Sequence, residues 1–379
     1  MKCKLSDICD FRKGKVDVSN LTLKTYISTE NMLPNKGGIT VASSLPTVQL
    51  TQEYKKGDVL VSNIRPYFKK IWRAKYDGGC SNDVLVFQGN SNIDGNFLYY
   101  VLANDDFFAY SMATSKGTKM PRGDKSSIMQ YEVPKFDIDT QRKIASVLRN
   151  LDEIIELNSA INNNLEQQAQ AIFSNEFLTL ETLPDGWKQA SLIDIADYLN
   201  GLAMQKYRPT AGETGIPVLK IKELRQGCCD DNSELCSPNI KSEYIIHDGD
   251  VIFSWSGSLL VDFWCSGICG LNQHLFKVTS NKYDKWFYYA WTKHHLDRFI
   301  AVAADKATTM GHIKRDELSK AEVLIPNEAD YKRIGALLQP IYDLIIENRI
   351  ENKKLTETKD TLLPKLMSGE IDISEVDYE

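Results

Sequence analysis

The stretch that decides the fold runs from residue 140 to residue 177 and reads TQRKIASVLRNLDEIIELNSAINNNLEQQAQAIFSNEF. It contains neither Pro nor Gly, and its apolar residues recur at intervals of three and four, as the buried face of a helix does. The positions of this stripe are Ile144, Val147, Leu151, Ile154, Asn158, Ile161, Leu165, Gln168 and Ile172. A stripe this narrow, sustained over about five heptads, predicts a long helix that packs against another helix.

A second stretch repeats this pattern 190 residues later. Its stripe consists of Ile334, Leu337, Ile341, Leu344, Asn348, Glu351, Leu355, Thr358 and Leu362. Asn158 and Asn348 take the same a position in the two stripes, where an amide lowers stability but fixes register. We therefore predict that the helices pack against each other and that these two amides hydrogen-bond across the seam. The alternative is that each helix packs only on its own domain.

The remainder of the chain is repeated as well. Lys56–Ser62 recurs as Asp248–Ser254, and Arg142–Leu148 recurs as Lys332–Leu338. Offsets near 190 residues are far longer than a solenoid period, so they indicate two domain-sized copies. Each copy has short, β-branched strands and one helical segment, at about residues 95–110 and 284–300, before its long helix.

These patterns predict an α+β fold in which each of two tandem domains is followed by a long helix, and the two helices pack against each other. Pro134 and Pro326 close the globular parts just before each long helix. The predicted boundaries are 1–138 for the first domain, 139–178 for the first helix, 179–327 for the second domain, and 328–379 for the second helix with the C-terminal tail.

The charge of the chain is unevenly distributed. The whole chain has a net charge of −6, but residues 1–138 carry 19 basic and 14 acidic residues, a net charge of +5. Residues 179–327 carry 16 basic and 19 acidic residues, a net charge of −3. An anionic partner responds to the charge within a Debye length of about 8–10 Å, so the first domain suits phosphate groups.

Basic residues interleaved with aromatic ones in the first domain point to nucleic acid, because Lys and Arg bind phosphates and Arg also reads guanine edges. The alternative is a solvated strand pair whose charges merely face water. The candidate DNA-binding residues lie in one run near residues 55–75 and one loop near residues 115–125. They are Arg65, Lys69, Lys70, Arg73, Lys116, Lys119 and Arg122.

The second domain must bind an anionic partner with a more confined positive surface. Its candidates are Lys206, Arg208, Lys306, His312, Lys314 and Arg315. The loop from Lys306 to Arg315 aligns with the loop from Lys116 to Lys125, so we expect both loops to approach a ligand from equivalent directions. The Met residues in these loops leave open that the loops instead tuck into the domain cores.

Motifs of catalysis and metal binding are missing from the sequence. There is no phosphate-binding loop, no dinucleotide fingerprint and no nucleophile elbow. The eight cysteines lack the paired spacing of a zinc site, so we expect reduced thiols, no metal and no catalytic residue. No apolar run approaches the ~18–20 residues of a membrane span, and the N-terminal residues lack an apolar secretory segment. We expect a cytoplasmic protein.

Several motifs resemble the specificity subunit of type I restriction–modification enzymes. Each long helix opens on a similar segment, Asp139–Ile144 or Asp330–Ile334. The C-terminal Leu363–Ile371, the segment Leu183–Lys188 before the second copy and Leu271–Phe276 within it are also similar to that family. The resemblance covers nearly the full length and is weakest in the variable globular parts.

The resemblance implies that each globular part is a target-recognition domain that reads one half of a bipartite target in double-stranded DNA. The two long helices would form an antiparallel coiled coil that separates the two domains, related by a pseudo-two-fold, and sets the gap between the half-sites. The expected partners are two modification subunits and restriction motor-nuclease subunits. S-adenosylmethionine, ATP and Mg would bind to those partners, and none of these cofactors would bind this chain.

Two other classes of protein remain open at this point. The chain could be a single-chain nucleic-acid methyltransferase with an unrecognised active site, or a scaffold that organises partner proteins without binding DNA. A methyltransferase would bind S-adenosylmethionine without a partner. A scaffold would show no salt-dependent, sequence-preferring binding to DNA.

Overall fold

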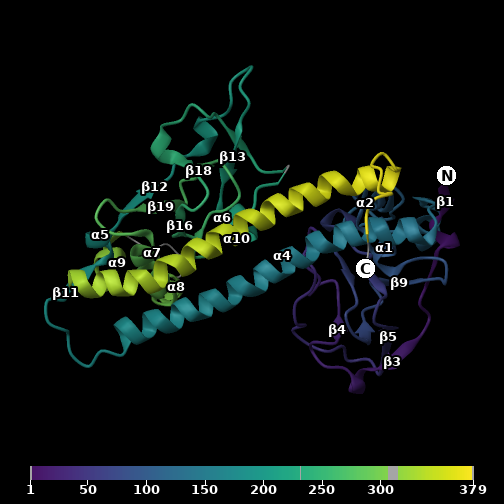
Figure 1. Ribbon diagram of the computed structural model, residues 1–379, viewed down its shortest axis with the longest axis horizontal. Coiled ribbons are helices and arrows are strands. Elements are labelled where there is room, and N and C mark those ends of the chain that lie inside the picture. The colour runs from purple at the N-terminus through teal and green to yellow at the C-terminus, as the bar shows by residue number, and fades with distance from the viewer. Residues whose placement is uncertain (1, 231, 306–314, 378–379) are drawn as a thin grey trace. The chain divides into compact units, whose positions relative to one another are not determined.

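The computed structural model describes residues 2–230, 232–305 and 315–377 (Figure 1). The chain divides into two compact units, Met1–Glu153 with Thr356–Glu379 and Ile154–Leu355. Both limits fall inside a long helix, whereas the sequence placed its boundaries at the helix starts. Each unit therefore contains part of both long helices.

Unit 1 contains one strand pair and two four-stranded sheets. The pair joins β1 (Lys2–Lys4) to β10 (Glu132–Pro134). The antiparallel sheet has the order β2 (Cys9–Phe11), β9 (Val84–Gly89), β6 (Val59–Ser62), β7 (Ile71–Arg73). The mixed sheet has the order β3 (Lys15–Asp17), β5 (Leu50–Tyr54), β8 (Gly78–Cys80), β4 (Tyr26–Ile27), with β4 parallel to β8.

Unit 2 repeats this plan, except that the fourth strand of its mixed sheet lies on the opposite edge. Its strand pair joins β11 (Lys188–Ser191) to β20 (Glu322–Ile325). The antiparallel sheet has the order β12 (Asp197–Asn200), β19 (Leu275–Thr279), β16 (Val251–Ser254), β17 (Leu260–Phe263). The mixed sheet has the order β14 (Leu235–Cys236), β13 (Ile216–Leu219), β18 (Cys269–Leu271), β15 (Ile245–Ile246), with β13 parallel to β18. The α+β class and the internal repeat are thus confirmed.

The helices outside the long pair are short. They are α1 (Gly95–Ala103), α2 (Asp105–Ala113), α3 (Lys125–Ile128), α5 (Leu192–Ile195), α6 (Ile221–Gln226), α7 (Lys285–His294), α8 (Leu296–Asp305) and α9 (Arg315–Ser319). The single helix expected at residues 95–110 is two helices, because Asn104 is extended and its side chain caps α2 by accepting from the Asp106 amide. The helix expected at residues 284–300 is likewise divided, at His295.

Both predicted long helices are present: α4 (Ile138–Phe173), continued by one π turn over Ser174–Leu178, and α10 (Glu328–Ser368) (Figure 1). Equivalent residues cap them. Asp137 accepts a hydrogen bond from the Thr140 amide, and Asn327, 190 residues later, accepts one from the Asp330 amide, both at 2.9 Å. A short polar side chain before the first turn satisfies an otherwise unpaired helical N–H, so the sequence fixes where each helix begins.

Each long helix also completes the core of a unit. In unit 1, Leu363, Leu366 and Met367 of α10 pack with Leu148 of α4 among the side chains of the first domain. In unit 2, Phe173 and Phe177 take the places equivalent to Leu363 and Met367. The C-terminal segment Leu363–Ile371 therefore serves the core of the first domain, although it is the most distant segment in sequence.

The predicted stripes do not coincide with the buried face. Ile154 and Leu344 are each 41% exposed, although both were expected in the seam. Asn162 and Ala169, which lie outside the stripe, are buried at 6% and 1% exposure. Intervals of three and four fit more than one face of a helix, so the pattern predicted the helix correctly and its seam only in part.

The two Asn residues do not meet as we expected. Within unit 2, Asn158 Nδ2 donates to Asn352 Oδ1 at 3.0 Å, and Asn348 Nδ2 donates to Asn162 Oδ1 at 2.9 Å. The predicted bond between Asn158 and Asn348 is therefore wrong by one helical turn. The antiparallel direction within unit 2 is as predicted, because higher positions in α4 pair with lower positions in α10.

The two amide pairs are copies of each other. Exchanging residue numbers by the 190-residue offset turns the first pair into the second. The backbone contacts obey the same rule: Asn352 Nδ2 donates to the Ile155 carbonyl oxygen, and Asn162 Nδ2 donates to the Ile345 carbonyl oxygen, both at 3.3 Å. The helix pair in unit 2 therefore has a local two-fold between these amide pairs, and four amides fix its register.

Replacing Asn348 with Leu is expected to lower the free energy of unfolding of the full chain by about 1–3 kcal/mol, because the buried amide of Asn162 loses a partner. The double change Asn162→Leu with Asn348→Leu should recover most of this loss, since both polar groups are removed together. Urea unfolding measures both values, with Leu157→Ala as the control at an exposed position of α4. A double variant as unstable as the summed single variants would contradict the pairing.

Candidate nucleic-acid interface

Two loops of the first domain lie together. One joins β6 to β7 over residues 63–70, and the other spans residues 115–124. The Arg65 amide donates to the Pro121 carbonyl oxygen at 2.8 Å, and Ile64 forms an isolated bridge with Arg122. Arg65 and Lys69 both have left-handed backbones, with φ of 51° and 50°. Such strain in non-Gly residues persists where the surrounding structure imposes it, and it is common at binding sites.

Six of the seven predicted cations lie on these loops as at least partly exposed side chains, and four of them are at the loop surface. Lys69 forms an ion pair with Asp105 at 2.8 Å, Lys116 with Asp124 at 2.6 Å, and Arg122 with Asp83 at 3.2 Å; Lys119 is exposed. Lys116 lowers the pKa of the Asp124 carboxyl by hydrogen bonding, which keeps it ionised. The exposed surface of the two loops therefore carries cations beside carboxylates, and its net positive charge is smaller than the sequence suggested.

The other three predicted cations have part of their side chains engaged or buried. The Lys70 ammonium donates to the Thr29 carbonyl oxygen at 2.6 Å, and burial lowers its pKa. Within the part of the chain that the structure describes, the Nε atoms of Arg65 and Arg73 are buried without a hydrogen-bond partner. Arg73 ends β7 at the end away from the loop, with its guanidinium against Gly95. Arg65 and Lys70 therefore lie on the same loops as the other cations, and Arg73 lies off them.

The aromatic residues interleaved with this basic run divide into two groups. Trp72 is buried in a core cluster. Tyr67 and Phe68 are 49% and 38% exposed at the tip of the β6–β7 loop, with ring centroids 4.7 Å apart. Met120 in the neighbouring loop is 48% exposed, so it does not tuck into the core. The first domain therefore presents an exposed apolar tip flanked by cations, a combination that suits nucleic acid.

The second domain has a cavity of about 420 Å³ at the carboxyl ends of its parallel strands β13 and β18. Arg208, Lys220, Lys222, Glu234, Gln273 and His274 are among its lining residues. Glu234 accepts from Lys220 at 2.6 Å and is paired with Arg208 at 3.1 Å, so its two oxygens hold one cation each. The Lys220 hydrogen bond lowers the pKa of the Glu234 carboxyl. Arg208 was predicted from the sequence; Lys220 and Glu234 were not.

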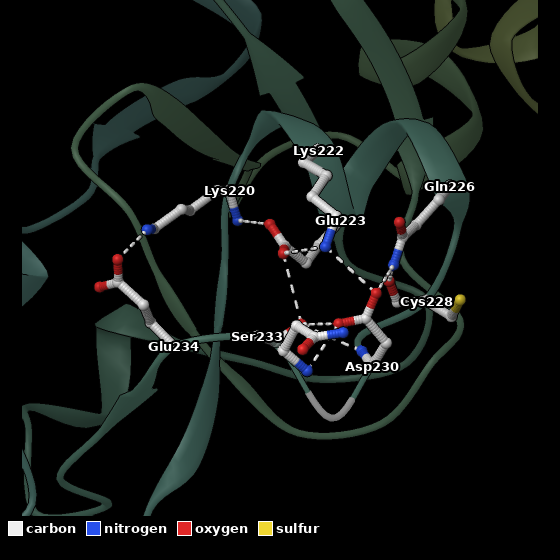
Figure 2. Close-up of polar contacts among 9 residues, drawn as sticks. Lys220, Lys222, Glu223, Gln226, Cys228, Asp230, Ser233 and Glu234 are labelled. Carbon is white, nitrogen blue, oxygen red and sulfur yellow. Dashed lines mark hydrogen bonds and ion pairs between the residues drawn. The ribbon is translucent and has the colours of Figure 1, made fainter. Parts of the chain in front are cut away.

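Figure 2 shows the polar network that holds the loop following α6, together with Lys220, Lys222 and Glu234, which line the cavity. Glu223, only 3% exposed, accepts from the Lys220 amide and from the Ser233 hydroxyl, both at 3.3 Å. Asp230 accepts from the Lys222 ammonium at 3.1 Å and is further bonded within its own loop. These hydrogen bonds restrain the backbone next to Lys220 and Glu234.

Asn272, Gln273 and His274 of the segment Leu271–Phe276 line another side of the cavity. His274 Nδ1 lies 3.2 Å from the Ser256 hydroxyl, and its Nε2 lies 3.3 Å from the Gln273 amide nitrogen. Trp255 donates to Asn200 at 3.0 Å and lies beside the imidazole. The ring is thus held in one orientation.

The structure describes only some of the other candidate residues of the second domain. Lys206 is exposed at the end of a short 3₁₀ turn, Met204–Lys206. Arg315 begins α9 and donates to the Tyr198 carbonyl oxygen at 3.5 Å. Lys306, His312 and Lys314 lie outside the described residues, so the predicted equivalence of this loop with Lys116–Lys125 stays a prediction.

Across residues 2–230, 232–305 and 315–377, no group of three or more His, Cys, Asp or Glu side chains is arranged to hold a metal ion. All eight cysteines are free thiols. Within the same ranges no helix has the length and apolar character needed to cross a bilayer.

Comparison with known proteins identifies the class. Residues 1–167 and 184–357 each match the type I restriction modification DNA specificity domain, and this chain belongs to that family. It is 24% identical to the type I restriction enzyme MjaIX specificity subunit of Methanocaldococcus jannaschii, over 95% of this chain and 88% of that protein. It is 23% identical to the HindI specificity subunit of Haemophilus influenzae, over 97% and 98% of the two chains.

A crystal structure of the type I restriction–modification system S subunit from M. genitalium has a similar fold. Its TM-score is 0.59 at 15% identity, with 97% of this chain and 96% of that chain covered. The duplicated α+β domains and the two long helices are therefore features of the specificity-subunit fold.

Proposed function

We infer that this chain is the DNA specificity subunit of a type I restriction–modification system. The observation that carries this inference is the duplication of one specificity domain, with the same order in the antiparallel sheet, the same three central strands in the mixed sheet and a different outer strand in each copy. Two like scaffolds with unlike surfaces suit the reading of two different half-sites. The specificity subunits MjaIX and HindI, similar to this chain over nearly their full lengths, support the same conclusion.

In this proposal, each domain reads one half of a bipartite target in double-stranded DNA. The first domain uses the two adjoining loops with Arg65, Lys69, Lys70, Lys116, Lys119 and Arg122, together with Arg73 at the end of β7. The second uses Lys206 and Arg208, with Arg315 and the loop from Lys306 to Lys314. The helix pair, held in register by Asn158 and Asn348 with their partners, sets the gap between the half-sites.

The chemistry belongs to other subunits in this proposal. Two modification subunits would transfer the methyl group of S-adenosylmethionine to adenine, and a motor-nuclease subunit would use ATP and Mg for restriction. The chain itself would bind none of these cofactors and would act in the cytoplasm, where its free thiols stay reduced.

The competing functions are a single-chain methyltransferase and a scaffold that does not bind DNA. Isothermal titration of the purified chain with S-adenosylmethionine separates the first: we expect no binding heat and no methyl transfer until modification subunits are added. Saturable binding by the chain alone would favour the enzyme. For the second, assembly without sequence-preferring, salt-dependent DNA binding would favour a scaffold.

A further inference from the structure

Both domains have a cavity at the same topological place. In the second domain it lies where β13 and β18 end, and in the first a cavity of about 470 Å³ lies where the equivalent parallel strands β4 and β8 end. Ser28, Asn31, Ser81 and Asp83 are among the residues that line the first cavity. The two cavities share a position and differ in chemistry, as expected if each contacts a different half-site.

The cavity of the second domain is rich in hydrogen-bond donors. Arg208, Lys220 and Lys222 line it with one carboxylate, that of Glu234. The side chain of Arg208 is 53% exposed and that of Glu234 is 40% exposed, so both face solvent while they are paired with each other. Because Glu234 also holds Lys220, the position of its carboxylate is fixed from two sides.

This arrangement suits a base pair better than a phosphate. A carboxylate between two cations repels a phosphate and cancels part of their attraction for it. In the major groove, a G·C pair presents the O6 and N7 acceptors of guanine beside the N4 donor of cytosine. Arg208 and Glu234 present donors beside an acceptor, and a carboxylate has lone pairs left after accepting two hydrogen bonds. The two patterns are complementary.

We propose that the cavity of the second domain reads a G·C pair of its half-site, with Arg208 contacting guanine and Glu234 accepting from cytosine while it holds Arg208 in place. This inference rests on the proposed function, because it assumes that the second domain faces DNA. Beyond the proposed function, it assigns one residue, one base pair and the major groove to this contact. It also separates Arg208 from the cations that contact only phosphates.

The test uses the full chain assembled with its modification subunits and a set of duplexes carrying the methylated target. Each base pair of the half-site assigned to the second domain is replaced in turn. We expect the native complex to discriminate against replacement of one G·C pair by roughly 5- to 150-fold. Arg208→Ala should reduce discrimination at that pair to about 2-fold or less, and leave it unchanged at the other pairs.

Arg208→Lys is the decisive variant, because it keeps the charge but not the two-pronged donor geometry. Loss of discrimination with an unchanged salt dependence of binding supports base reading. Glu234→Gln should lower discrimination at the same pair, and Arg298→Ala, which removes another ion-paired Arg of this domain, should change nothing. Melting temperatures of all variants confirm that they are folded.

Three outcomes would overturn the inference: native-like discrimination in Arg208→Lys, an equal loss on all duplexes in Arg208→Ala with a smaller salt slope, or a half-site without a G·C pair. The first two would make Arg208 a phosphate contact. If the native complex preferred no sequence at all, the proposed function itself would fail. The two failures are therefore distinguishable.

Discussion

Inserting one heptad into each long helix, after Ile154 in α4 and after Leu355 in α10, is expected to lengthen the DNA gap that the complex accepts by about three base pairs. Seven helical residues add about 10 Å at 1.5 Å per residue, and DNA rises about 3.4 Å per base pair. The half-sites themselves should stay the same, because neither domain surface changes. Selection of bound duplexes from a library with variable gaps measures the effect.

The insertion points are chosen from the structure. They lie at the limits between the two compact units and beside the amide pairs, so the bonds of Asn158 and Asn348 remain intact. They also lie outside the contacts that α4 and α10 make with each domain core.

The matched control places the same heptad in α4 alone. This change breaks the pairing of the helices on one side of the amide pairs and should abolish binding to every gap length. If the double insertion left the preferred gap unchanged, the helix pair would not determine the spacing.

Removing three charges from the adjoining loops of the first domain, by Lys69→Gln, Lys119→Gln and Arg122→Gln together, is expected to weaken DNA binding roughly 10²- to 10³-fold at about 0.1 M salt. Each phosphate contact contributes about 0.9 to the slope of log affinity against log salt, so the slope should fall by about three. The loss should be equal for specific and unrelated duplexes, because phosphates carry no sequence information.

The control for this variant removes three exposed cations on another part of the same domain, Lys2 and Lys4 on β1 and Lys135 directly after β10. We expect a change of less than about threefold. Equal effects of the two triple variants would mean that only the net charge of the domain matters. An unchanged slope in the loop variant would mean that these cations face water only.

The features that the sequence predicted are those with local or periodic causes. The long helices follow from apolar spacing, and the two domains from the repeat. The seam was predicted only in part, because Ile154 and Ala169 both fit helical spacing and only packing decides which is buried. The predicted pairing of Asn158 with Asn348 was displaced by one helical turn for the same reason.

The candidate site depended on contacts that no local pattern reveals. Lys69 meets Asp105 and Arg208 meets Glu234, so much of the positive charge counted along the sequence is paired in space. The cavity beside β13 and β18 arises from strands that are more than 45 residues apart. The signal that could have pointed to it was the segment Leu271–Phe276, whose polar residues line the cavity.

The measurement that tests the central claim most directly is sequencing of random-sequence DNA retained by the full chain assembled with its modification subunits. The account predicts one bipartite motif, two short half-sites separated by a gap of fixed length and free sequence. It further predicts that Arg208→Lys relaxes one base pair in one half-site and leaves the other half-site intact. A single uninterrupted motif, or retention of DNA without any sequence preference, would contradict the account.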